Sequence, residues 1–349
     1  MRLEPRAHIP LWLSLAAPVA AVALAFACCA LLIVWAGAPV VAAYEALLRG
    51  AFGSVFAVTE TLTRAAPLIF TGLAAAVAFR AKLWNIGAEG QLYAGALAAT
   101  WIGTGMVTLP PLLMVPLLFL AGALAGGLLL LVPAILKLKL RVDEVVTTLL
   151  LNFIVILFVN YLVFGPWKDP LSMGWPQAAP IIEEGILDPL VPRMRLHAGF
   201  LWAVGLAVFT WAFIRFSRWG FQIRAVGHNP EAAAFAGLPV GATVLRTALL
   251  SGGLAGMAGV CEVAGAKGYL TLDISPGFGY TGIAVAMLAG LHPLGVVAAA
   301  IFVAAIYNGA DAMSRAMSIS NYLADVLTAT ALLLVLASVL FVRFRPRLR

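Results

Sequence analysis

Three polar residues stand close together in an otherwise apolar part of this 349-residue chain. The segment Arg80–Gln91 reads RAKLWNIGAEGQ, so that Asn85, Glu89 and Gln91 enter an apolar helix among small residues. A carboxylate in apolar surroundings is costly unless it is paired or faces a polar cavity. The segment therefore predicts a broken helix start that lines a transport path or its gate. In the alternative interpretation, Glu89 is an interfacial acid that the helix dipole stabilises.

A second group of polar residues repeats at helical spacing in RVDEVVTTLLLN, residues 141–152. Asp143 and Glu144 fit the first turn of a helix, and Glu144, Thr148 and Asn152 follow one another at intervals of four. Residues at this spacing share one face of a helix. The stripe either lines a hydrophilic path or hydrogen-bonds a neighbouring helix.

Familiar catalytic and metal-binding motifs are absent from the sequence. The four histidines are isolated, the three cysteines lack metal-ligand spacing, and no HExxH, CxxC or GxSxG pattern occurs. The chain contains no Gly-Lys dipeptide and so cannot form a GxxxxGK[ST] phosphate loop. We expect no enzyme activity, cofactor or metal in this chain; if ATP drives the protein, another subunit must bind it.

The composition identifies the elements that must position these residues. Hydrophobic residues make up 63% of the chain, charged residues only 11%, and the mean hydropathy is +1.03. A soluble domain has roughly 25% charged residues. The sequence therefore predicts an integral membrane protein.

Ten apolar segments could form helices of a polytopic, all-α membrane bundle, since a crossing helix needs about 20 apolar residues. They are residues 11–36, 58–79, 86–104, 112–136, 145–164, 199–216, 243–263, 278–290, 293–310 and 321–342. Residues 1–349 are expected to form a single transmembrane domain. It comprises an N-terminal helix and connector (1–54), a core (55–342) and a basic tail (343–349).

The basic residues predict the orientation of the chain. With the amino terminus in the cytoplasm and alternating spans, 15 of the 22 Lys and Arg residues fall on the cytoplasmic side. A bias of this kind sets membrane topology. The formal net charge of +7 therefore reports orientation and not nucleic-acid binding, and both termini are expected inside.

Two short Gly-rich segments, residues 85–98 and 277–290, each stand second in a set of four spans. This order is compatible with an inverted repeat that contains broken helices. A long external connection, Phe164–His197, is rich in proline and acidic residues. It forms either a docking surface or a surface cap, because connections of this length are uncommon unless functional.

The internal loop between residues 218 and 239 contains a short capped helix. Asn229 followed by Pro230 is a good helix start, and Gly237 suits a left-handed end. A helix over Glu231–Ala236 is too short to bury a core of its own. It is either held by another protein or serves as an amphipathic connector.

Four motifs in order resemble the inner-membrane permeases of bacterial ABC importers. They are NIGAEGQ (85–91), VDEVVTTLLLN (142–152), GFQIRAVGHNPEAAAFAG (220–237) and GYTGIAVAMLAGLHPLG (279–295). The resemblance is to the branched-chain amino acid/ribose permease family, and within it to the simple-sugar/nucleoside branch served by a basic-membrane-protein-type lipoprotein. It covers about residues 55 to 342. Asp143 stands where the family pattern has Asn, a near-isosteric change that retains a helix cap.

The resemblance implies that residues 224–237 form a coupling helix that docks on an ATPase subunit. The matching positions are Arg224, Ala225, Val226, Gly227, Asn229, Pro230, Glu231, Ala232, Ala233 and Gly237. His228 occupies a variable position and receives no role. The candidate path or gate residues are Asn85, Glu89, Gln91, Glu144, Thr148 and Asn152.

The resemblance also implies the partners and the activity. An ABC ATPase subunit would bind ATP and Mg, and a second, different permease chain and an extracytoplasmic substrate-binding lipoprotein would complete an importer in the bacterial inner membrane, in contact with membrane lipid. The expected cargo is a nucleoside. Alternatives are ribose-like sugars or branched-chain amino acids carried by the same machinery, or, in another class, a secondary transporter that uses no ATPase.

Overall fold

The computed structural model describes residues 2–5 and 11–347. Its helices are α1 (Leu11–Trp35), α2 (Val40–Phe52), α3 (Val55–Arg80), α4 (Ala88–Gly103), α5 (Pro111–Leu140), α6 (Glu144–Phe164), α7 (Gly199–Phe216), α8 (Arg218–His228), α9 (Pro230–Phe235), α10 (Val240–Cys261), α11 (Phe278–Leu288), α12 (Pro293–Met317) and α13 (Asn321–Arg343). A 3-10 turn (Glu183–Gly185) and a π-helical extension of α10 (Glu262–Lys267) add to these, and two four-residue strands, β1 (Arg2–Pro5) and β2 (Phe344–Arg347), pair antiparallel. The predicted all-α fold class is confirmed.

Each of the ten predicted apolar segments coincides with a helix. Six helices of the described residues, α3, α5, α6, α7, α12 and α10 with its extension, are long and apolar enough to cross a membrane singly. The pair Ala23–Trp35 and Val40–Phe52, bent by 118°, adds a seventh if it counts as one span. The chain is therefore a multi-pass membrane protein. The sequence did not predict α2 or α8.

The helices α4 and α11 are too short to cross a bilayer alone. They have 16 and 11 residues, which gives lengths of about 24 Å and 17 Å against a hydrocarbon core of roughly 30 Å. These are the two Gly-rich segments that the sequence singles out as broken helices.

Contacts divide the chain into a terminal unit, residues 1–61 and 301–349, and a central unit, residues 62–300. Residues 348–349 of the predicted basic tail lie outside the described part. In the terminal unit, α1 packs along α13, and Ile33, Ala43 and Met313 belong to one buried cluster. Asn308 donates hydrogen bonds to the carbonyls of Gly50 and Ala57 there.

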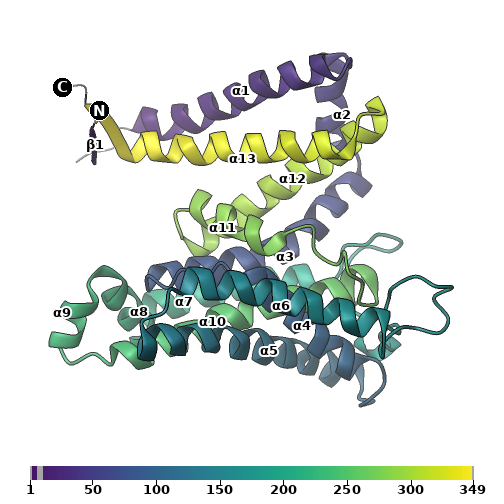
Figure 1. The fold of residues 1–349 in the computed structure, drawn as a ribbon. Coiled ribbons are helices and arrows are strands. Elements are labelled where there is room, and N and C mark those ends of the chain that lie inside the picture. The colour runs from purple at the N-terminus through teal and green to yellow at the C-terminus, as the bar shows by residue number, and fades with distance from the viewer. Residues whose placement is uncertain (1, 6–10, 348–349) are drawn as a thin grey trace. The chain divides into compact units, whose positions relative to one another are not determined.

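The core of the central unit is the close packing of α4, α5 and α10, and Figure 1 shows α5 and α10 running alongside each other. Gly122 and Gly126 on α5 face Gly252 and Gly256 on α10, and a Cβ at any of these four positions would overlap atoms of the facing helix. Small residues spaced by four let helix backbones approach within a membrane. The glycine-rich sequence of these helices thus produces a tight core.

Exposure separates a buried helix from lipid-facing ones. On α3, Leu68, Ile69 and Phe70 have no exposed surface. On α6, by contrast, Phe153 and Leu157 are among the exposed large apolar side chains. In a membrane such a surface faces lipid or another hydrophobic chain without penalty, which explains why α6 is so apolar.

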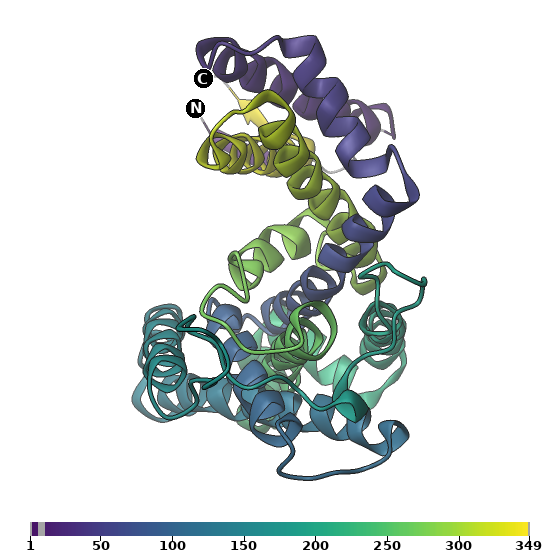
Figure 2. The same ribbon diagram turned by 90° about the vertical axis from the view of Figure 1, so that its right-hand side faces the viewer.

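The long connection between α6 and α7 is fastened to the segment that follows α10. Ala178 N–H donates to the Leu270 carbonyl at 2.9 Å, Ile181 N–H to Gly268 at 2.9 Å, and Leu187 N–H to Ala264 at 2.8 Å. Figure 2 views the central unit from the end at which this teal connection lies in front. Its tip, with Met173, is exposed. The connection caps this end, and a docking role for it stays a prediction.

His197, the last part of that connection, is buried. Its Nδ1 accepts a hydrogen bond from Gly199 N–H at 3.2 Å, and its Nε2 has no hydrogen-bond partner among the described residues. Burial, with a contribution from the charge of Arg195, lowers the pKa of His197 from 6.5 to about 4. The imidazole is therefore neutral in the folded protein near pH 7.

Candidate functional site: a buried polar network and a capped helix pair

The chain reverses direction after α3 and enters α4 through residues 81–87. Lys82 has a positive φ of 55°, and Leu83 N–H donates to the Ala78 carbonyl at 3.1 Å. Asn85 then accepts a hydrogen bond from Gly87 N–H at 2.9 Å. Gly87 occupies the N-cap position of α4, and the Asn85 side chain closes the turn before it.

Asn85 is the centre of a buried set of amides. Its Nδ2 donates to Gln91 Oε1 at 2.9 Å and to Ser251 Oγ of α10 at 3.1 Å. Gln91 Nε2 donates back to Asn85 Oδ1 at 2.9 Å, and Ser251 donates to the Ala74 carbonyl of α3 at 2.8 Å. These bonds join α3, α4 and α10 at one point. Ser251 was not among the predicted site residues, since one serine in a run of small residues is no signal.

The polar stripe on α6 contacts the backbone of the same segment, one residue per helical turn. Glu144 Oε1 accepts from Trp84 N–H at 3.2 Å, and Thr148 Oγ accepts from Ile86 N–H at 3.3 Å. Asn152 accepts from Gly90 N–H at 2.8 Å and donates to the Ile86 carbonyl at 3.0 Å. An irregular backbone inside a membrane protein must have its polar groups satisfied. The stripe supplies those partners.

Glu89 lies where two short helices meet end to end. Its Oε2 accepts a hydrogen bond from Gly279 N–H, in the first turn of α11, at 2.6 Å. A Cβ on Gly279 would overlap the backbone of Glu89, so the N-termini of α4 and α11 are in direct contact. Both N-termini carry partial positive charge, which a carboxylate between them offsets. Tyr280 extends the junction to α6 by accepting from Asn152 Nδ2 at 3.1 Å.

The structure thus brings all six predicted path residues into one network. Each of them is buried, and their hydrogen bonds run to one another, to the backbone of residues 84–90 and 279, and to the side chains of Ser251 and Tyr280. The contact between α4 and α11 joins the two short helices of the suspected repeat. A role of the network in translocation stays a prediction.

The helix pair α8 and α9 is built from strong local signals. Ser217 Oγ accepts from Gly220 N–H at 2.9 Å at the start of α8. Asn229 Oδ1 accepts from Glu231 N–H at 3.0 Å and from Ala232 N–H at 3.1 Å, with Pro230 in the first position of α9. Gly237 follows with a φ of +77°. The predicted short capped helix is present, shifted by one residue to Pro230–Phe235.

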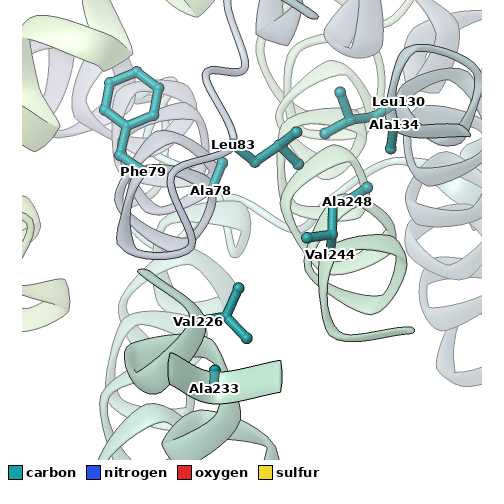
Figure 3. Packing of buried hydrophobic residues seen from close by; sticks show 9 residues of the cluster. All are labelled: Ala78, Phe79, Leu83, Leu130, Ala134, Val226, Ala233, Val244 and Ala248. Carbon is teal, nitrogen blue, oxygen red and sulfur yellow. The ribbon is translucent and has the colours of Figure 1, made fainter. Parts of the chain in front are cut away.

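One side of this pair packs on the bundle, as Figure 3 shows. Val226 of α8 and Ala233 of α9 are buried in the cluster that Phe79 and Leu83 share with residues of α5 and α10. Gly227 fits against the Arg80 carbonyl so closely that a Cβ would overlap it.

Lysine side chains extend this contact to the buried network. Lys82 Nζ donates to the His228 carbonyl at 3.2 Å. Lys137 Nζ donates to the Lys82 carbonyl at 3.2 Å and forms an ion pair with Glu144 of the stripe. A short series of contacts therefore runs from α8 to the segment that leads into α4. No local pattern predicts this series, because its members are far apart along the chain.

The other side of the pair faces outward. Pro230, Glu231 and Ala232 are exposed, and Phe235 is 97% exposed. Phe235 was not among the predicted coupling residues, although an aromatic side chain in an alanine-rich helix outside the apolar spans was a usable signal. Arg224 differs from the exposed positions, because it is half-buried and its guanidinium contacts the Ile214 carbonyl of α7.

Comparisons with known proteins agree on a transport family. The protein-family model for the permease component of branched-chain amino acid transport systems matches residues 57–336 of the chain. The guanosine ABC transporter permease protein NupP of Bacillus subtilis is 36% identical, over 92% of each chain. The glucose ABC transporter permease protein TsgB13 of Haloferax volcanii is 35% identical, over 99% of this chain and 93% of its own.

The nucleoside ABC transporter permease protein NupB of Lactococcus lactis is 31% identical, over 78% of this chain and 77% of its own. No solved structure matches the chain.

Proposed function

The chain belongs to the family of branched-chain amino acid transport system permeases, and we propose that it translocates a nucleoside as one permease subunit of an ATP-driven importer. A separate ATPase subunit binds ATP and Mg and supplies the energy. A second permease chain and an extracytoplasmic substrate-binding lipoprotein complete the complex. The chain lies in the bacterial inner membrane with both termini in the cytoplasm.

The match to the guanosine permease carries the proposal of a nucleoside, because it is 36% identical over 92% of both chains and a further relative is also a nucleoside permease. The match to the glucose permease, at 35% identity, supports a second candidate, a sugar. Both candidates use the same machinery and differ only in cargo.

The coupling surface follows from the shape of α8 and α9. One side of the pair is fixed to α3, α5 and α10, while the other presents Phe235 and the first turn of α9. A rigidly seated segment with an exposed aromatic side chain can transmit a push from a partner. We place the ATPase contact at Phe235 and Glu231, with the lysine contacts carrying motion toward α4.

Transport in vesicles tests the cargo. The chain is reconstituted with its ATPase, second permease and binding protein, and uptake of labelled guanosine and of labelled glucose is followed with and without ATP. We expect ATP-dependent guanosine uptake that excess glucose does not compete away. Glucose uptake without guanosine uptake would make the protein a sugar permease. Uptake driven by an ion gradient without ATP would contradict the ABC mechanism.

Affinity for the ATPase tests the coupling surface. Phe235→Ala should weaken ATPase binding by about 30-fold, the effect of losing an aromatic anchor worth roughly 2 kcal/mol. The melting temperature should stay unchanged, because the ring makes no buried contact. Phe153→Ala, at an exposed position on α6, is the matched control. Equal ATPase affinity of the two variants would place the contact elsewhere.

A further inference from the structure

A basic depression of about 480 Å³ lies in the central unit beside α8. Its lining includes Arg80, Arg215, Arg224 and His292, together with Trp211 and Phe216. The volume falls in the range of small-molecule sites. Neither the buried network nor the exposed side of α9 accounts for it.

Two of the three arginines of this depression contact backbone carbonyls. Arg80 Nε donates to the Leu291 carbonyl at 2.9 Å, and Arg224 contacts the Ile214 carbonyl. The three arginines have no carboxylate partner among the residues that the structure describes, where ion pairs form instead at Glu45, Glu144 and Asp273. Like charges are thus gathered without compensation, an arrangement that an anion would stabilise.

The guanidinium N–H groups of these arginines that are not bonded to backbone carbonyls are suitable donors for a phosphate. A guanidinium presents several N–H donors in a planar fork that matches phosphate oxygens. His292 Nδ1 accepts from Gly295 N–H at 3.4 Å, which leaves Nε2 as the ring nitrogen that can donate to a ligand.

The lining residues also lie at similar depths relative to the membrane, because several of them stand at ends of long helices. Arg80 is the last residue of α3, Arg215 lies in the last turn of α7, and Pro293 begins α12. The ends of spanning helices lie near the lipid headgroups, where Trp is enriched. Basic pockets between transmembrane helices at this level bind phospholipid headgroups.

We propose that this depression, named here the Arg80–Arg224 pocket, binds a phosphate-bearing anion, and its depth favours the headgroup of an anionic phospholipid. The bound phosphate bridges the end of α3, the end of α7 and α8. It neutralises the arginines and braces the segment that carries α9, so the lipid composition of the membrane affects the seating of α8.

Lipid binding to the purified full chain tests the proposal without any partner protein. The chain in detergent is titrated with dioleoyl-phosphatidylglycerol, dioleoyl-phosphatidylcholine or inorganic phosphate, and both the melting temperature and the lipid retained in native mass spectrometry are recorded. We expect phosphatidylglycerol to be retained and to raise the melting temperature, with little effect of phosphatidylcholine. Protection by inorganic phosphate without a further gain from phosphatidylglycerol would assign the site to a soluble phosphate.

Arginine variants locate the binding. Each arginine near a headgroup contributes roughly 1 kcal/mol, so Arg215→Gln should weaken phosphatidylglycerol binding about fivefold and Arg80→Gln/Arg224→Gln about 30-fold. Arg215 is exposed, so its variant carries little risk to folding. Arg80→Lys/Arg224→Lys should restore part of the affinity.

Arg246→Gln is the matched control. Arg246 is exposed on α10, and its guanidinium lies 4.8 Å from the Trp219 ring and outside the pocket lining. Its variant should bind lipid as the unmodified chain does. Equal affinity of Arg215→Gln, of the double Gln variant and of Arg246→Gln would overturn the proposal, as would the absence of any protection by phosphatidylglycerol and by phosphate.

Discussion

The buried network around Asn85 and the helix pair α8–α9 are both built from polar and small residues, yet they use them in opposite ways. In the network, side chains of α6 bond to the irregular backbone of residues 84–90, and Ser251 of α10 bonds to the Asn85 side chain. In the helix pair, the polar side chains of Ser217 and Asn229 bond only to their own helix starts. The first region depends on the rest of the fold for its shape. The second has its own shape and leaves a surface for a partner.

This difference distinguishes polar residues that stabilise the fold of a membrane protein from polar residues that serve its association with a partner. A substitution in the network should cost stability, because it leaves backbone groups unsatisfied where no water reaches them. A substitution on the outer side of α9 should leave the fold unchanged and affect association. Four further predictions test this division, in order of expected effect.

Asn152→Leu should have the largest effect, a loss of about 3–5 kcal/mol in the free energy of unfolding. It leaves Gly90 N–H and the Ile86 carbonyl without their partners, and each orphaned group costs roughly 1–3 kcal/mol. Denaturant titration of the purified protein in detergent measures it. Asn160→Leu on the same helix is the control, since Asn160 bonds only to the Ile156 carbonyl of its own helix. Equal losses for the two variants would show that the network is not special.

His197 is a buried polar residue of which only one ring nitrogen, Nδ1, has a hydrogen-bond partner among the described residues. Its pKa is lowered to about 4, so the imidazole is protonated near pH 6.5 in the unfolded chain but only near pH 4 in the folded chain. The contribution of His197 to the free energy of unfolding should therefore be constant above pH 6.5. It should fall by about 3 kcal/mol as the pH drops to 4. His197→Gln should lack this part of the pH dependence. An unchanged pH profile in that variant would rule out His197 as its source.

Lys137→Met tests the contact that joins the two regions. Glu144 is buried, and removing its ammonium partner is costly, although the partial exposure of Lys137 reduces the effect. We expect a loss of about 1–2 kcal/mol in the free energy of unfolding, with less than about 0.5 kcal/mol for Lys139→Met, at an exposed position two residues on. An equal loss in the free energy of unfolding for Lys139→Met would show that the Lys137–Glu144 ion pair makes no specific contribution to stability.

Asn229→Ala should give the smallest and most local effect. Loss of the N-cap destabilises α9 by about 1 kcal/mol, which speeds amide hydrogen exchange at residues 231–235 about fivefold. The global unfolding transition should move little. Asn229→Asp retains an accepting oxygen and should keep the slow exchange. Fast exchange in both variants would show that the side chain does not hold α9.

Local patterns predicted much of this molecule. The long apolar runs located helices, Asn229-Pro230 located the start of α9, and Asp143 is the N-cap of α6 as expected, with its carboxylate 2.7 Å from Val145 N. The spacing of Glu144, Thr148 and Asn152 placed them on one face. Each of these features depends on residues a few positions apart, and that is the range over which helix periodicity and capping act.

Contacts between distant residues were beyond such patterns. The spacing of the stripe on α6 predicted that it faces either a polar path or a neighbouring segment. In the structure, Thr148 and Asn152 of the stripe bond to backbone groups about 62 residues earlier in the chain. Phe235 reads as one more apolar residue until its exposure is known. Arg224 matches a coupling motif, yet its guanidinium contacts α7.

Hydropathy, motif order and helix caps are local properties of the chain, and they were enough to predict a polytopic helical membrane protein of a permease family. The folded chain was needed to learn that the two short helices meet at Glu89, that the polar stripe satisfies a broken backbone, and that arginines of α3, α7 and α8 share one depression. These features arise from distant segments that pack at glycine-lined contacts. Packing of that kind depends on the geometry of the whole bundle and on no single stretch of residues.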